Sequence, residues 1–125
     1  MENYHGKQSD IVYLVTNTKL MEEHNKEFVF TDGHAIMALS EFYKDLEDLA
    51  RVDWSVMESK YWFDDADHPD RKRRRQAEFL VHQQVELSLF LGIGVYNQRM
   101  KETVNKILKE YHIEMNVLIR PQFYY

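Results

Sequence analysis

The clearest periodic pattern lies near the end of the chain. Between Gln98 and Tyr111, apolar residues recur every three or four positions, which is the spacing of one face of a helix. Asn97 stands directly before this stripe and is a preferred N-cap residue, so the pattern predicts a helix over 98–111. A second stripe predicts a helix within residues 34–51, whose apolar face consists of Ile36, Leu39, Tyr43, Leu46 and Ala50.

Elsewhere the apolar residues form short runs that are rich in β-branched and aromatic side chains. Such runs are typical of strands, and they cover residues 11–15, 27–30, 76–82, 92–96 and 114–119. Shorter helical segments are expected near residues 20–23 and 85–91, and Asp53 is expected to cap a short turn. Trp54 and Trp62 are assigned to the core. This pattern predicts an α/β or α+β domain.

Composition narrows the class of protein. At 125 residues, with 44% hydrophobic and 14% aromatic residues, the chain is predicted to fold as a single domain over 1–125. It contains no cysteine, which excludes disulfides and thiolate metal sites and is compatible with a reducing cytoplasm. No apolar run reaches the ~18 residues of a membrane helix and no secretory signal opens the chain, so we expect a cytoplasmic protein without a membrane partner.

Charge is strongly segregated along the chain. The net charge of −5 argues against a nucleic-acid packaging protein, yet five consecutive cations, Arg71–Arg75, directly follow the acidic stretch 64–70. The basic run is predicted to be a loop, either simply solvated or a patch that attracts polyanions. The acidic stretch lacks the glycine and the final glutamate of a calcium-binding loop, so we predict no metal site there.

A carboxylate lies in the strand predicted after the basic run. Side chains alternate between the two faces of a strand, so Ala77, Phe79 and Val81 share an apolar face. Gln76 and Glu78 project from the opposite face, next to the positive loop. A lone glutamate in such a strand is more often a solvent-facing residue, but a carboxylate beside an anion-attracting patch suits chemistry on a phosphate-bearing substrate.

Several longer blocks follow one another in a definite order. They include Ile11-Val12-Tyr13-Leu14, Phe28-Val29-Phe30-Thr31-Asp32-Gly33-His34-Ala35, Val52-Asp53-Trp54, Arg74-Arg75-Gln76-Ala77-Glu78-Phe79-Leu80-Val81-His82 and Gly94-Val95-Tyr96. Together these blocks resemble the DarT family, the toxins of the DarT–DarG toxin–antitoxin system. The resemblance covers nearly the whole chain, from about Tyr4 onward. It implies an α+β fold of the ADP-ribosyltransferase type, with mixed sheets flanked by helices.

The family resemblance also implies an activity and a set of site residues. Members are NAD-dependent transferases that modify thymidine in single-stranded DNA, with NAD as the co-substrate and no metal. Glu78 is then the catalytic and NAD-binding residue, which stabilises an oxocarbenium-like transition state and accepts a proton from the thymine ring. The residues expected to contact DNA are Arg71, Arg73, Arg74, Arg75, Gln76 and His34.

The resemblance covers only the C-terminal portion of such a transferase. Family members carry an N-terminal part with a His-x-Thr-like element and an arginine at the NAD pocket, and neither has a counterpart here. Two alternatives to a transferase active on its own therefore stay open. The chain is either an inactive module that binds single-stranded DNA or a DarG-like antitoxin, or a fragment that is active only with a separate N-terminal half.

Overall fold

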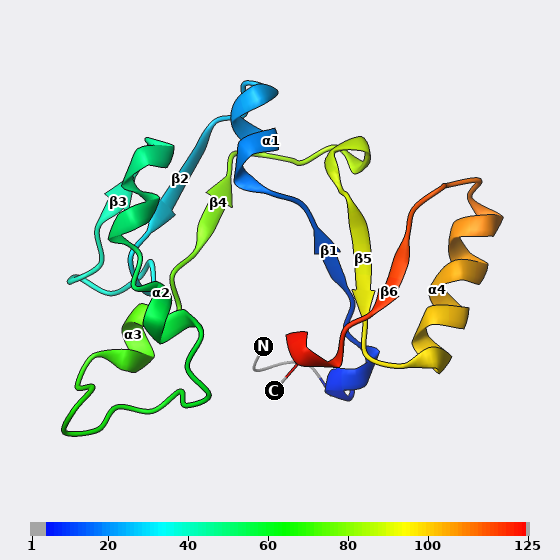
Figure 1. The fold of residues 1–125 in the computed structure, drawn as a ribbon. Coiled ribbons are helices and arrows are strands. Elements are labelled where there is room, and N and C mark those ends of the chain that lie inside the picture. Colours follow the sequence, from blue (N-terminus) through cyan, green and yellow to red (C-terminus); the bar gives the residue numbers. More distant parts are fainter. Residues whose placement is uncertain (1–4, 125) are drawn as a thin grey trace. The chain divides into compact units, whose positions relative to one another are not determined.

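A computed structural model describes residues 5–124, and within them the chain forms an α+β fold. The α-helices within these described residues are α1 (Thr18–Glu23), α2 (Trp54–Met57), α3 (Arg71–Arg75) and α4 (Gln98–Glu110). The six strands are β1 (Tyr13–Val15), β2 (Phe28–Thr31), β3 (Phe42–Tyr43), β4 (Phe79–Val81), β5 (Gly92–Val95) and β6 (Val117–Ile119), as Figure 1 shows. The chain divides into two compact units: unit 1 is Met1–Leu20 with Val85–Tyr125, and unit 2 is Met21–Gln84.

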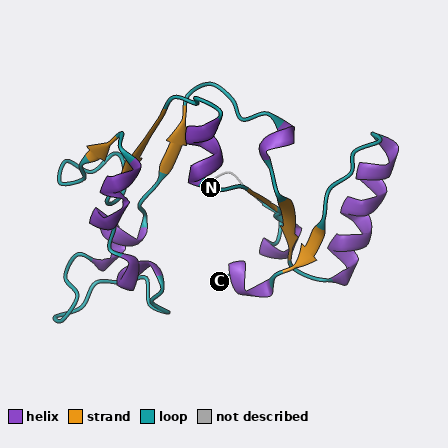
Figure 2. Ribbon diagram, turned by 45° about the horizontal axis from the view of Figure 1, so that its top comes forward, coloured by secondary structure: helices purple, strands orange, loops and turns teal. Residues whose placement is uncertain are grey.

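Unit 1 is a mixed three-stranded sheet with a helix packed against it. Its strand order is β1-β5-β6, with β1 antiparallel and β6 parallel to β5. Figure 2 shows α4 lying beside this sheet. The helix begins at Asn97, whose side chain accepts a hydrogen bond from the Met100 amide at 3.0 Å, as the sequence predicted. Between helix and sheet lies a core formed by Ile93, Val95, Met100 and Val117.

The other face of this sheet carries aromatic side chains from the two ends of the unit. The Tyr13 ring meets the Tyr124 ring edge to face, with 5.0 Å between centroids. A Cβ placed on Gly94 would lie 2.9 Å from the Phe123 ring, so only glycine fits beneath that ring. Glycine at this position thus lets the Phe123 ring approach the strand closely.

Unit 2 contains an antiparallel sheet with strand order β3-β2-β4. One face is aromatic: the Phe28 and Phe79 rings stack at 4.8 Å between centroids, and the fully buried Phe30 lies between Phe79 and Tyr43. The predicted apolar face of the strand around Phe79 is therefore confirmed. The opposite face is open, and Leu80 and Phe42 on it are 42% and 56% exposed.

The helix predicted within residues 34–51 is wrong. Residues 34–40 instead form successive tight turns, in which the amides of Met37 and Ser40 bond three residues back. Asp32 then accepts a hydrogen bond from the Glu41 amide at 2.9 Å, which starts β3 alongside β2. A short 3-10 helix follows at Leu46–Arg51. Ile36 and Leu39, predicted to face the core, are 83% and 74% exposed.

The segment that contains the basic run also differs from its prediction. Arg71–Arg75 is helix α3 rather than a loop, and the Gln76 and Ala77 amides still bond back to Arg73 and Arg74. The strand predicted over 76–82 therefore begins only at Phe79 and ends at Val81. The helix predicted near 85–91 is reduced to a 3-10 turn at Leu87–Leu89.

Only one of the two tryptophans that were predicted to lie in the core is partly buried. Trp54 is 52% exposed rather than in the core, although Asp53 caps its helix as predicted, by accepting a hydrogen bond from the Val56 amide at 3.1 Å. Trp62 is partly buried.

Among residues 5–124, no helix is long and apolar enough to cross a membrane.

Candidate active site

Glu78 lies between the end of α3 and the start of β4, with an exposed side chain. Its backbone is held on both sides by one residue of β2, because Thr31 N donates to the Glu78 carbonyl at 2.9 Å and Glu78 N donates to the Thr31 hydroxyl at 3.0 Å. Within the described range 5–124, nothing forms a hydrogen bond or an ion pair with the Glu78 carboxylate. A carboxylate on a fixed backbone is thus left available to an external group.

Two further predicted site residues, Gln76 and His34, lie at the end of α3 and in the turn that follows β2. Gln76 caps α3 and is partly buried, so it precedes the strand instead of sharing a pleat with Glu78. The His34 amide donates to the Arg73 carbonyl at 2.9 Å, as expected of a turn residue. The His34 Nδ1 atom is buried and has no hydrogen-bond partner in the described part of the chain.

Two arginines of the basic run act as internal anchors. Arg71 is 5% exposed, and its guanidinium lies 5.6 Å from the Tyr61 ring centroid and 6.0 Å from that of Phe63. Arg75 donates to the carbonyls of Val56 and Met57 at 2.8 and 2.7 Å and lies over the Trp62 ring at 4.3 Å. Both side chains therefore hold the preceding segment against α3.

The remaining cations are paired to different extents. Arg73 forms a close ion pair with Asp70, at 2.6 Å, and also donates to the Ser40 hydroxyl at 3.0 Å. Arg74 bridges Asp70 and Asp53 at 3.2 and 3.1 Å but keeps 47% of its side chain exposed. Bonding to Arg73 lowers the pKa of the Asp70 carboxyl. Lys72 is exposed, and no ion pair involves it among residues 5–124.

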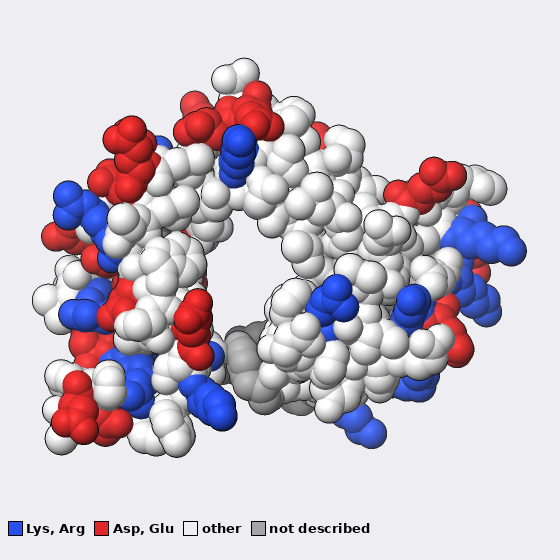
Figure 3. Space-filling model, viewed as in Figure 1, with Lys and Arg blue, Asp and Glu red and all other residues white. Residues whose placement is uncertain are grey.

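The surface around α3 is consequently of mixed charge. Figure 3 shows acidic and basic side chains side by side over unit 2, rather than a patch of a single sign. Asp64 accepts a hydrogen bond from the Lys72 amide at 2.9 Å, and Asp65 accepts one from the His68 amide at 2.7 Å, which is the main cause of its lowered pKa. No group of three or more metal-ligating side chains comes together within the described residues.

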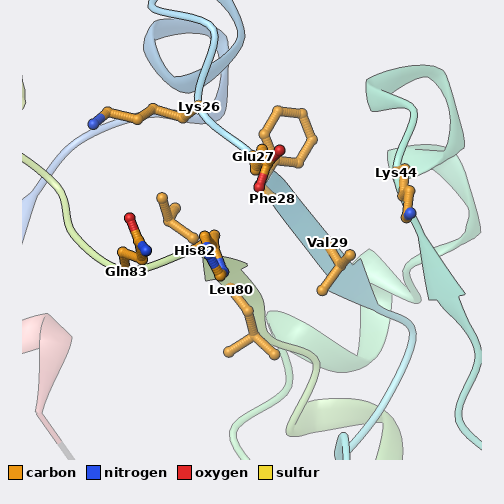
Figure 4. A pocket seen from close by; sticks show the side chains of 9 residues that line it. Lys26, Glu27, Phe28, Val29, Lys44, Leu80, His82 and Gln83 are labelled. Atoms are coloured by element: carbon orange, nitrogen blue, oxygen red, sulfur yellow. The ribbon is translucent and has the colours of Figure 1, made fainter.

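A cavity of about 680 Å³ adjoins β2 and β4 on the open face of the unit 2 sheet. Val29 and Leu80 contribute apolar side chains, while Lys44 and His82 contribute polar ones (Figure 4). Leu80 is two residues after Glu78, so both side chains project from the same face of the chain. His82 ends the block that begins at Arg74, but nothing in the sequence singles out its side chain or that of Lys44 as a site residue.

Thr31 is the residue that sequence reasoning overlooked. In its block, Thr31-Asp32-Gly33-His34, only the histidine is predicted as a site residue. The available signal is a threonine at the end of a predicted strand and directly before an Asp-Gly turn, where its hydroxyl can bond to the turn backbone. Because the structure buries Thr31, this hydroxyl must find partners within the chain. Those partners are the Gly33 carbonyl and the Glu78 amide.

Known proteins share this fold and much of this sequence. The chain matches the structure of Thermus sp. 2.9 DarT in complex with NAD+ with a TM-score of 0.91 at 36% identity, covering 98% of this chain and 62% of that one. The structure of the same protein in complex with ADP-ribosylated ssDNA matches with the same TM-score and identity, covering 58% of that chain. In sequence, the DNA ADP-ribosyl transferase of Thermus sp. (strain 2.9) is 38% identical over 124 residues, which are 98% of this chain and 58% of the relative.

These likenesses first define the class, an α+β fold with one mixed and one antiparallel sheet that matches a DNA ADP-ribosyltransferase. A family described as "ssDNA thymidine ADP-ribosyltransferase, DarT" matches residues 1–125. The chain belongs to the DarT family. It spans a little over half the length of the curated relatives it matches, 58% in one case and 53% in another.

Proposed function

We propose that this chain supplies the catalytic carboxylate and the DNA-facing segment of an NAD-dependent transferase that ADP-ribosylates thymidine in single-stranded DNA. The observation that carries the proposal is the exposed, unpaired Glu78 carboxylate on a backbone fixed by Thr31. It is supported by the likeness to a relative whose structures hold NAD+ and ADP-ribosylated ssDNA. In this proposal the two units belong to one transferase domain, which works in the cytoplasm.

Glu78 has two tasks in the proposed reaction. The bond between the ribose C1′ and nicotinamide breaks, nicotinamide leaves, and positive charge develops on the ribose. The Glu78 carboxylate binds the NAD ribose and stabilises that charge, as carboxylates do in glycoside hydrolysis. A thymine ring nitrogen then bonds to C1′, and Glu78 accepts the proton that this nitrogen loses.

The DNA-facing residues divide according to their burial. Lys72 and Arg74 are exposed on α3, so we assign them to phosphate contacts, while Gln76 lies at the helix end, two residues before Glu78. Arg71, Arg73 and Arg75 make internal contacts, so we assign them to shaping the segment rather than to binding phosphate directly. His34 stays a candidate because its Nδ1 atom lacks a partner in residues 5–124.

Transfer of labelled ADP-ribose from NAD to a thymidine-containing oligonucleotide tests this function. The chain is assayed alone and together with the N-terminal segment of the Thermus relative. We expect label on the oligonucleotide, reduced by about 10²–10⁴-fold in Glu78→Gln and unchanged in Glu58→Gln, which alters another exposed glutamate of unit 2. Label that survives Glu78→Gln would contradict the proposal.

The exposed side chains of Lys72 and Arg74 on α3 favour a second candidate function, because phosphate contacts by these cations do not require bound NAD. In this alternative the chain binds single-stranded DNA, or an antitoxin, without consuming NAD. Oligonucleotide affinity should then fall with salt, and Lys72→Ala should reduce the slope of log K against log salt by about 0.7 if that lysine contacts one phosphate. Salt-dependent binding without transfer in any mixture would favour this alternative.

A further inference from the structure

We infer that Thr31 is a positioning residue for Glu78, and that the turn Thr31–Gly33 fixes the carboxylate and helix α3 relative to each other. The inference rests on the proposed function of Glu78. It concerns a fully buried residue whose hydroxyl bonds to the backbone of Glu78 and of the turn.

The contact between Thr31 and Glu78 departs from a regular antiparallel pair. In a regular hydrogen-bonded pair, the two residues exchange two backbone bonds. Here Thr31 N donates to the Glu78 carbonyl at 2.9 Å, but the return bond from Glu78 N ends at the Thr31 hydroxyl, at 3.0 Å. The side chain of Thr31 therefore replaces a backbone acceptor at the residue that carries the carboxylate.

The hydroxyl of Thr31 is used in both directions. It accepts the bond from Glu78 N and donates its own proton to the Gly33 carbonyl at 2.6 Å. A hydroxyl can do both at once, whereas a methyl group can do neither. Thr31 is fully buried, so water does not replace a lost bond there, and the hydroxyl is a fixed link between Glu78 and the turn.

The opposite side of the turn lies directly against α3. A Cβ placed on Gly33 would lie 2.6 Å from Arg73 Nη1 and 3.0 Å from the Arg73 carbonyl. The His34 amide donates to that same carbonyl at 2.9 Å. Glycine is needed at position 33 because any larger residue would push the turn away from the helix.

One turn thus holds two parts of the proposed site. Through Thr31 it fixes Glu78, and through Gly33 and His34 it fixes the end of α3, which carries Arg74. The distance between the carboxylate and the proposed DNA-facing helix then depends on this turn. Because misplacing a reacting group by about 1 Å costs about 10²-fold in rate, loss of the Thr31 hydroxyl should lower the transfer rate by that order.

Amide hydrogen exchange of the full chain, followed by NMR, tests the link directly. In the wild-type chain the Glu78 amide should be protected to within about tenfold of the Leu80 amide, the next β4 amide that points toward β2, although Glu78 precedes the strand. Thr31→Val, which keeps the shape and removes the hydroxyl, should accelerate Glu78 exchange by at least about tenfold, and Thr31→Ser should restore protection. Thr103→Val is the control, because it removes the hydroxyl that bonds to the Arg99 carbonyl in α4.

An unprotected Glu78 amide in the wild-type chain would overturn the inference, even if Thr31→Val did not fold. So would equal exchange at Glu78 in the wild-type and Thr31→Val chains.

The transfer assay separates this inference from the proposed function. Thr31→Val should lower kcat with little change in KM for the oligonucleotide, and Thr31→Ser should recover it. If Glu78→Gln abolishes transfer while Thr31→Val leaves kcat unchanged, the function stands and the positioning role fails. If Glu78→Gln leaves transfer unchanged, the function fails instead.

Discussion

Each of the two units is stabilised internally by a different kind of contact. In unit 1, β5 is buried along its whole length and α4 packs an apolar stripe against the sheet. In unit 2, the sheet has an aromatic core, but the turns and helices around it are fixed by polar side chains, chiefly Thr31, Arg71, Arg73 and Arg75. The candidate active site lies in the unit with the polar contacts.

This difference has a physical basis. Burial of apolar surface stabilises a fold strongly but has no preferred direction, whereas hydrogen bonds require set distances and angles. Unit 1 needs stability from its core. The segment around Glu78 is held by directional bonds of Thr31 and Arg73, which suit the positioning of a reacting group that we propose for it.

The largest effect is expected from a cavity in the core of unit 1. Ile93→Ala should destabilise the chain by about 2–5 kcal/mol, because Ile93 packs between the sheet and α4. Amide exchange should accelerate mainly in β5, β6 and α4. Equal acceleration in β2 and β4 would show that the two units unfold together, which would weaken the distinction between them.

A smaller loss is expected from removing an anchor of unit 2. Arg75→Met leaves the carbonyls of Val56 and Met57 without their charged donor, so it should cost about 1.5–3 kcal/mol. Urea denaturation measures the change. Lys72→Met is the matched control on the same helix and should stay within about 0.5 kcal/mol of the wild type. Similar losses in both variants would mean that the internal contacts of Arg75 contribute little.

The smallest change in stability is expected when the Asp70 carboxylate is protonated at low pH or replaced by an amide. The pKa of Asp70 is lowered in the folded chain, chiefly by its bond to Arg73, so its stabilising contribution is present above the unfolded pKa of about 4 and is lost as the pH falls through the folded value. Asp70→Asn should remove about 1 kcal/mol or less near neutral pH and flatten the fall in stability below pH ~4. Thermal unfolding between pH 3 and pH 7 would measure this, with Asp67→Asn as the control. An unchanged pH dependence in Asp70→Asn would contradict the role of this ion pair.

The same contrast explains what the sequence could predict. The helix over 98–111, its cap at Asn97 and the strand around Ile93 depend on apolar periodicity and local capping, and they are confirmed. The helix over 34–51 failed because Asp32 binds the Glu41 amide and His34 binds Arg73, contacts between residues far apart that no periodicity reports.

Only part of the candidate site can be predicted from the sequence, because the contacts that orient the arginines join residues that are distant in the sequence. Glu78 was selected from its position in a short block and from the family resemblance, and its exposure agrees with the predicted face. The arginines were selected for their charge, but Arg71 and Arg75 are enclosed by aromatic rings and carbonyls from residues 56–63. Charge in a sequence does not reveal which cations the fold uses internally.

Both tryptophans of the chain lie in unit 2, and their surroundings differ. Trp54 is 52% exposed, whereas Trp62 lies under the Arg75 guanidinium at 4.3 Å. Excitation at the red edge of the absorption band therefore reports on unit 2 and leaves unit 1 dark. Without any attached dye, the emission spectrum then reports the unfolding of the segment next to Glu78, and it offers a test of the proposed binding of an oligonucleotide there.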